Sequence, residues 1–177
     1  RTGMRFFICF GINRQFHSLE FAQRLLWSEG RAILKVGIIG GGRVGSRLAA
    51  SLREAGVLVG ITAASEQHSA QLAQQFGVPA TDNAKLWQAA DVLLLTVPDR
   101  LIGTVAEELA QSVTPAAKVV LHVSGSVGLE PLAPLAQLGA HVGSLHPLQS
   151  FAGGNTKLAG VYMACLLYTS PSPRDTR

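Results

Sequence analysis

The chain of 177 residues lacks the features that define several classes of protein. It has only two cysteines, and neither their number nor their spacing suggests a disulfide framework or a zinc site. No two histidines and a carboxylate lie at metal-ligand spacing, so we expect no metal. No stretch approaches the roughly 18 consecutive apolar residues of a membrane-spanning helix, so we expect no membrane partner. Membrane-spanning and disulfide-stapled proteins are therefore excluded, and the length suits one globular domain.

Charge is scarce in the body of the chain. The net charge of +4 and the pI near 9.5 would suit a nucleic-acid-binding protein. The basic excess, however, lies at the two ends, because residues 36–164 carry seven basic and eight acidic side chains. A nearly neutral body offers no electrostatic footprint to a phosphate backbone, so we expect no nucleic-acid partner.

Aromatic residues are few, and five of the seven phenylalanines fall within residues 1–34. This Arg-rich segment differs in composition from everything that follows it. We interpret residues 1–34 as an N-terminal extension that arises from a mis-called or upstream-extended start. An organellar presequence is the alternative, although Glu20, Glu29 and the missing initiator methionine argue against a clean targeting signal.

The C-terminal segment, residues 165–177, resembles one reading frame of the transposase adapter used in preparing sequencing libraries. A disordered tail rich in proline and serine is the alternative. Adapter read-through predicts that the natural gene was cut after about Ala164 and that a C-terminal portion is missing. Cys9 would then be the only native cysteine, which is consistent with a reducing compartment and favours the cytoplasm.

Between these ends, short apolar runs alternate with segments of helical periodicity. Helices are expected after the first two runs, and they end at Gly56 and Gly77. Repeated strand–helix units of this length predict an α/β fold with a doubly wound parallel sheet, the Rossmann fold. The runs predict buried strands at residues 35–40, 57–63, 92–97, 119–123 and 142–145.

A glycine-rich segment after the first predicted strand contains the motif that indicates a binding site. Residues 40–45 read Gly-Gly-Gly-Arg-Val-Gly, a G-x-G-x-x-G pattern that opens the first predicted helix. Gly40 permits a tight turn, Gly42 lets backbone amides approach a pyrophosphate, and Gly45 lets the helix pack close to the strand. The helix N-terminus adds positive potential. This context favours a dinucleotide site over a purely structural turn. The predicted binding residues of this motif are Gly40, Gly42, Arg43, Val44 and Gly45.

The residues at the end of the second predicted strand distinguish proteins that bind NAD from proteins that bind NADP. An acidic residue there would bind the ribose 2′-hydroxyl of NAD. Residues 63–65 hold no carboxylate, and Glu66 comes one position later. Ser65 leaves room for a 2′-phosphate, and Arg43 could reach that phosphate or lie over the adenine, unless it is simply solvated. The pattern mildly favours NADP over NAD.

Three further segments close predicted strands, where the ligands of a doubly wound sheet bind. The backbone of Val97 and Pro98 would border the nicotinamide ribose, unless the proline merely ends the strand. Ser124 could orient a substrate or serve only as a turn former. His146 follows the last short strand in a loop, where its imidazole either acts in general acid–base catalysis or is solvated.

Four segments, in this order, resemble a known family. They read KVGIIGGGRVGS at residues 35–46, LLLTVPD at 93–99, HVSGS at 122–126 and GSLHPLQSF at 143–151. Together they resemble the bacterial Rossmann-like oxidoreductases whose C-terminal helical domain is of unknown function. That family is related to the 6-phosphogluconate dehydrogenase-like enzymes, which include prephenate dehydrogenases, pyrroline-5-carboxylate reductases and ketopantoate reductases.

The resemblance implies an NAD(P)-binding domain followed by an all-helical domain that completes the substrate pocket and often a dimer. In the prephenate dehydrogenases, a serine after the corresponding strand and a histidine in a His-Pro loop contact the hydroxyl that is oxidised. Ser124 and His146 are similar to those residues by position. We accordingly assign residues 35–151 to the dinucleotide-binding domain and 152–164 to the start of a link to a missing domain.

We therefore hypothesise an oxidoreductase that transfers a hydride between a nicotinamide cofactor and a small substrate. The glycine loop would hold the pyrophosphate, Ser124 would orient the substrate, and His146 would exchange a proton. The alternative is a binding module that senses the dinucleotide without hydride chemistry. The full-length protein is expected to be a cytoplasmic homodimer, and the fragment alone is expected to be inactive.

Overall fold

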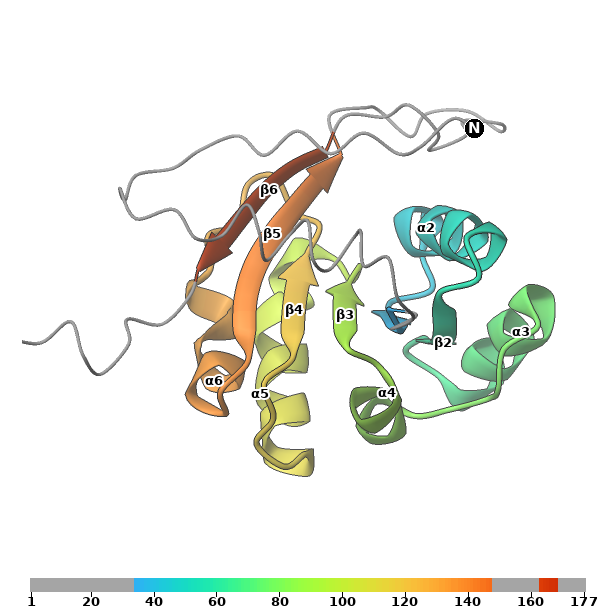
Figure 1. Ribbon diagram of the computed structural model, residues 1–177, viewed down its shortest axis with the longest axis horizontal. Helices are drawn as coiled ribbons and strands as arrows, with labels where there is room; N and C mark the ends of the chain where they lie inside the picture. Colours follow the sequence, from blue (N-terminus) through green and yellow to red (C-terminus); the bar gives the residue numbers. More distant parts are fainter. Residues whose placement is uncertain (1–33, 148–162, 169–177) are drawn as a thin grey trace, which may run out of the picture.

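The structure, a computed structural model, describes residues 34–147 and 163–168. Six strands form one sheet in the order β2-β1-β3-β4-β5-β6. The first five strands are parallel, and β6 pairs antiparallel with β5 at the edge (Figure 1). The strands are β1 (Val36–Ile39), β2 (Leu58–Thr62), β3 (Val92–Leu95), β4 (Val119–His122), β5 (His141–Pro147) and β6 (Met163–Tyr168).

Helices connect the parallel strands, as the doubly wound α/β prediction requires. The strands predicted at residues 35–40, 57–63, 92–97 and 119–123 are confirmed, each slightly shorter than predicted. The helices are α2 (Arg43–Glu54), α3 (Glu66–Phe76), α4 (Asn83–Ala89), η1 (Asp99–Leu101), α5 (Ile102–Ser112), η2 (Glu130–Leu132) and α6 (Ala133–Gln137).

Strands β1 and β3 are apolar throughout because helices cover both faces of the sheet. Successive side chains of a strand point to opposite faces. In β1, Ile38 belongs to the core that packs against α2 and α3, whereas Ile39 belongs to the core that packs against α4, α5 and α6. Leu94 and Leu95 of β3 divide between the same two cores. Burial on both faces explains why these runs show no alternation of apolar and polar residues.

The strand order creates a switch point between β1 and β3. The chain leaves β1 toward β2 on one side and then returns to β3 on the other side. In open α/β sheets, ligands bind beyond the carboxyl ends of the strands at such a point. The glycine motif at residues 40–45 follows β1, and residues 96–99 follow β3, so both segments lie at this edge.

Local signals fix the ends of α3. Ser65 is the N-cap, and its Oγ accepts a hydrogen bond from the backbone N–H of His68 at 3.2 Å. Gly77 ends the helix with φ of +65°, a conformation that favours glycine. The predicted end of this helix at Gly77 is confirmed. The preceding helix, α2, likewise ends two residues before Gly56, whose φ is +73°.

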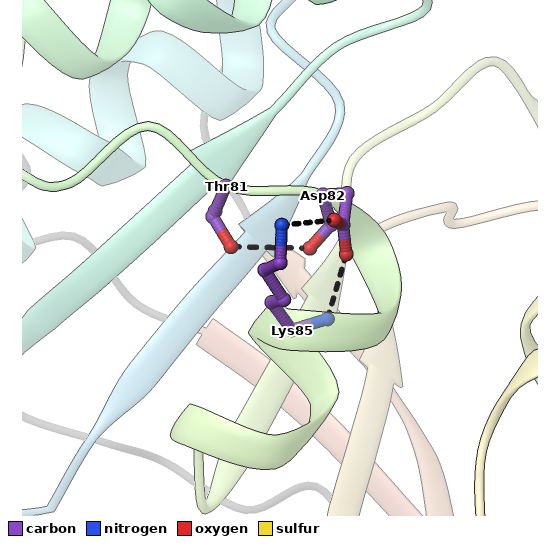
Figure 2. A network of polar contacts seen from close by, with 3 residues as sticks. All are labelled: Thr81, Asp82 and Lys85. Carbon is purple, nitrogen blue, oxygen red and sulfur yellow. Dashed lines mark hydrogen bonds and ion pairs between the residues drawn. The ribbon is translucent and has the colours of Figure 1, made fainter.

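The start of α4 is held by a group of polar contacts that Figure 2 shows. The Asp82 carboxylate accepts the backbone N–H of Lys85 at 2.8 Å and pairs with the Lys85 ammonium at 3.0 Å. Both contacts lower the pKa of Asp82, the backbone hydrogen bond most. Thr81 Oγ1 donates to the Asp82 carbonyl at 3.2 Å. Thr62 Oγ1 donates to Asn83 Oδ1 at 2.6 Å, which ties α4 to the carboxyl end of β2.

The last parallel strand is longer than the sequence predicts. A strand at residues 142–145 followed by a loop was expected, but β5 extends to Pro147 and includes His146. The placement of His146 in a loop was therefore wrong. Pairing with β4 stops at Ser144, whereas pairing with β6 continues along β5 and sets His146 opposite Ala164. The antiparallel partner, distant in sequence, thus supplies the hydrogen bonds that extend the strand.

Strand β6 crosses the proposed boundary between residues 152–164 and 165–177. Four residues of the segment interpreted as adapter-derived are therefore paired in the sheet, and their origin stays a prediction. The N-terminal extension and residues 148–162 lie outside the described residues. Among the helices of the described ranges, none combines the length and the apolar character needed to cross a membrane.

Candidate functional site

Gly40 makes the turn that leads from β1 into the glycine loop. Its φ is +123°, which side chains rarely allow. Its N–H donates to the carbonyl of Thr62 at 2.9 Å, which joins the turn to the end of β2. A Cβ at this position would lie 2.7 Å from the carbonyl carbon of Thr96. Both its conformation and its surroundings therefore require glycine.

Gly45 brings the first turn of α2 against that same turn. A Cβ on Gly45 would lie 1.9 Å from the carbonyl oxygen of Gly40 and 2.5 Å from Oγ1 of Thr96. The helix can approach the end of β1 only because no side chain stands between them. Gly45 thus sets where the N-terminus of α2 lies.

Thr96 clamps the glycine turn, a role that the sequence did not reveal. It follows β3 and is 8% exposed. Its N–H donates to the Ile39 carbonyl at 2.8 Å, and its Oγ1 donates to the Gly40 carbonyl at 2.7 Å. The hydroxyl has a single proton, so the contact of Oγ1 with the Ile39 carbonyl at 3.3 Å is the weaker one. A threonine at the end of the neighbouring strand was the only signal available in the sequence.

The N-terminus of α2 is open beside this rigid turn. Gly42 is the N-cap, with no side-chain capping bond, and a Cβ placed on it would meet nothing within 4 Å. Arg43 is exposed, and Val44 is partly buried. The first-turn N–H groups of a helix have no partner within it, and the helix dipole makes this end positive. The space over Gly42 and these donors fit a pyrophosphate.

The carboxyl end of β2 meets the glycine loop from the other side. Ser69 Oγ accepts the N–H of Ala63 and donates to the carbonyl of Ser65, both at 2.9 Å, so the turn between β2 and α3 is held firmly. Ser65 is exposed, and its Oγ uses one lone pair to cap α3. Residues 63–65 place no carboxylate at this strand end, and exposed Glu66 opens α3.

A second polar cluster lies where β3 and β4 end. Ser126 Oγ donates to Oδ2 of Asp99 at 2.7 Å, which bridges two loops 27 residues apart in the chain. Ser124 Oγ lies 3.3 Å from Ser126 Oγ and accepts the N–H groups of Ser126 and Val127, both at 3.2 Å. Hydrogen bonds from the hydroxyls of Ser126 and Ser124 lower the pKa of Asp99, so its carboxylate is charged at neutral pH.

His122, a neutral imidazole, is hydrogen-bonded to the backbone of this cluster at Ser124. It has no exposed surface, and burial lowers its pKa below the ordinary value of 6.5. The N–H of Ser124 donates to Nδ1 at 3.2 Å, so Nε2 carries the proton and donates to the carbonyl of Gly128 at 3.0 Å. His122 is therefore a buried core residue with a hydrogen bond at each ring nitrogen.

The remaining predicted residues lie at the same edge of the sheet. Val97 is half-buried against the core of α4 and α5, and exposed Pro98 precedes η1. Ser144 pairs with His122, so Ser124 and His146 each come two residues after a paired position on neighbouring strands. The backbone thus brings the segments of Ser124 and His146 to one end of the sheet.

Within residues 34–147 and 163–168, no group of three or more His, Cys, Asp or Glu is placed to hold a metal ion.

This arrangement defines an α/β domain of Rossmann topology with a glycine-rich turn between its first strand and first helix. The chain belongs to the Rossmann-like domain family, whose model matches residues 28–147. A search of curated proteins finds no match.

Solved structures share the fold. The arogenate dehydrogenase of Synechocystis has a TM-score of 0.63 and 23% identity, over 80% of this chain and 52% of its own. A pyrroline-5-carboxylate reductase from Coxiella burnetii has a TM-score of 0.56 and 23% identity, over 68% and 46%. A reductive aminase from Aspergillus terreus, in complex with NADPH and ethyl levulinate, has a TM-score of 0.55 and 16% identity, over 68% and 43%. The chain spans about half the length of these structures.

Proposed function

We propose that the chain is the cofactor-binding part of an NAD(P)-dependent oxidoreductase. The observation that carries the proposal is the glycine turn: Gly40 at φ of +123°, Gly45 against the Gly40 carbonyl, and open space over Gly42 at the start of α2. A purely structural turn would not need backbone N–H groups left accessible at a positive helix end. The dehydrogenase and reductases that share the fold support the same class of reaction.

The cofactor would lie along the carboxyl ends of β2, β1 and β3. Its pyrophosphate would contact Gly42, Val44 and the backbone of the first turn of α2. Arg43 and Ser65 would lie at the adenosine end, and the absence of a carboxylate at residues 63–65 favours NADP over NAD. The backbone of Val97 and Pro98 would border the nicotinamide ribose. When bound, the nicotinamide would supply or accept the hydride.

Ser124 and His146 are the proposed substrate-handling residues. The Ser124 hydroxyl is held by two backbone N–H groups, and the charged Asp99 carboxylate attracts its proton and that of Ser126. Those N–H groups use both lone pairs of the hydroxyl, so it is fixed in position and would serve a substrate oxygen or nitrogen as the donor of its single proton. His146, one strand away at the same sheet end, would exchange the proton that accompanies hydride transfer.

The proposal includes a small-molecule substrate and, for the full-length protein, a homodimer in the cytoplasm. The nearly neutral body of the chain argues against a nucleic-acid partner. A test of the reaction mixes the full-length protein, which includes the domain that completes the substrate pocket, with NADPH and a panel of 2-keto acids and cyclic imines and follows the nicotinamide absorbance. Oxidation of NADPH that depends on one substrate of the panel is the expected result.

A His146→Asn variant separates the enzyme from the alternative, a module that only senses the dinucleotide. For an enzyme, the variant loses turnover and keeps its affinity for NADPH, because the histidine acts at the substrate end. If the full-length wild-type protein binds NADPH tightly but reduces no member of the panel, the sensing module becomes the better account.

A further inference from the structure

The adenosine end of the site contains a histidine that the sequence patterns do not single out. A Cβ placed on Gly41, the second glycine of the loop, would lie 3.3 Å from Cε1 of His68 and 3.2 Å from Cβ of Ala63. The imidazole of His68 therefore lies against the glycine loop, near Ala63, the residue that follows β2. His68 is exposed, so this ring borders solvent where the adenosine ribose would lie.

The backbone of His68 is fixed in place. Its N–H donates to Oγ of Ser65, which makes His68 the third residue of α3 and anchors the ring beside the N-cap. The positive end of the helix dipole lies at this turn. The His68 imidazole and the Ser65 hydroxyl, whose proton is not used by the cap, thus belong to the same first turn of α3 and its N-cap.

Helical geometry distinguishes His68 from the nearby carboxylate of Glu66. Residues four apart share a face of a helix, and Leu72, four residues after His68, also contacts the Cβ position on Gly41. The face of α3 that carries His68 and Leu72 is therefore the face toward the glycine loop. Glu66 precedes His68 by two residues, a rotation of about 200° around the helix axis, so it points away from the loop.

We propose that His68 is the residue that selects NADPH over NADH, by hydrogen bonding to the 2′-phosphate together with Ser65. The inference rests on the proposed function, because it assumes that the glycine loop holds a nicotinamide dinucleotide. A phosphate on the ribose carries negative charge and several acceptor oxygens, and an imidazole can donate to it. The 2′-hydroxyl of NADH offers no such charge, and the carboxylate that would bind it is turned away.

The experiment measures dissociation constants of NADPH, NADH, 2′,5′-ADP and 5′-AMP for the wild-type chain, His68→Asn, His68→Arg and Glu66→Gln. Loss of a hydrogen bond to a charged group predicts that His68→Asn weakens NADPH and 2′,5′-ADP by about tenfold. NADH and 5′-AMP should bind that variant as they bind the wild type. His68→Arg should keep the preference for the phosphorylated ligands, because arginine also donates hydrogen bonds to phosphate oxygens.

Glu66→Gln is the matched control, since it changes a charge two residues away on the opposite face of α3. It should alter no dissociation constant by more than about twofold. The capping bond uses the His68 backbone, so every variant should keep it and remain folded at the temperature of the titration.

Equal loss of NADPH and NADH in His68→Asn, or no loss of either, overturns the inference and leaves the proposed function standing. Weaker NADH binding in Glu66→Gln would also overturn it, because Glu66 would then hold the ribose. Failure of the wild-type chain to bind either cofactor would remove the proposed function itself.

Discussion

Replacing Gly45 by alanine tests whether the close approach of α2 builds the site. The added Cβ would lie 1.9 Å from the carbonyl oxygen of Gly40 and 2.5 Å from Thr96 Oγ1, although real Cβ atoms keep at least 3.0 Å. The Gly40 carbonyl, which belongs to the backbone, would have to move by about 1 Å. Such overpacking costs up to about 3 kcal/mol, whereas alanine gains at most about 1 kcal/mol over glycine in a helix. The variant should be less stable by about 2 kcal/mol.

Gly42→Ala is the matched partner for this experiment. Gly42 has φ of −73° and ψ of −173°, which alanine adopts readily, and its Cβ would meet nothing. Its free energy of unfolding should therefore stay within about 0.5 kcal/mol of the wild type. The new methyl would, however, fill the space assigned to the pyrophosphate, so affinity for NADPH should fall by about tenfold or more.

Urea unfolding and NADPH titration, applied to both variants, separate the two effects. Gly45→Ala should lose both stability and binding, and Gly42→Ala should lose binding alone. The reasoning would be refuted if Gly45→Ala were as stable as the wild type, or if Gly42→Ala bound NADPH unchanged.

Three further predictions concern the polar groups at the strand ends. Thr96→Val keeps the shape of the side chain but removes its bond to the Gly40 carbonyl, so urea unfolding should show a loss of about 1–2 kcal/mol. The pKa of His122 is lowered by burial, so the folded state binds fewer protons, and the free energy of unfolding should fall as the pH drops below 6.5. A His122→Gln variant should lack this fall, and an identical fall in the variant would contradict the assignment. The pKa of Asp99 is lowered by the hydroxyls of Ser126 and Ser124, so its stabilisation should be lost only as the pH falls below 3.8, and Asp99→Asn should remove that separate phase.

The parts of the fold that the sequence predicts are those specified by local signals. An apolar run, a glycine-rich turn and an amphipathic helix follow one another in residues 35–56, so the strand, the turn and the helix can all be recognised without knowledge of distant partners. Gly77 ends α3 for an equally local reason, because its φ is positive.

The parts that the sequence does not predict depend on contacts between distant segments. His146 lies in β5 rather than in a loop because β6 pairs with it from beyond residue 162. Thr96 clamps the turn from a position just after β3, 56 residues further along the chain than Gly40. His68 becomes a candidate only when the face of α3 that meets Gly41 is known. The short helix α4 has too few residues for a clear periodic pattern, although it buries Trp87.

The central claim is that the glycine turn and the N-terminus of α2 hold a nicotinamide dinucleotide. Calorimetric titration of the chain with NADPH and with NADH tests it most directly, because binding needs no knowledge of the substrate. We expect one site per chain, tighter binding of NADPH than of NADH, and competition by 2′,5′-ADP. Absence of binding by both cofactors would contradict the claim and leave the glycine turn as a structural element.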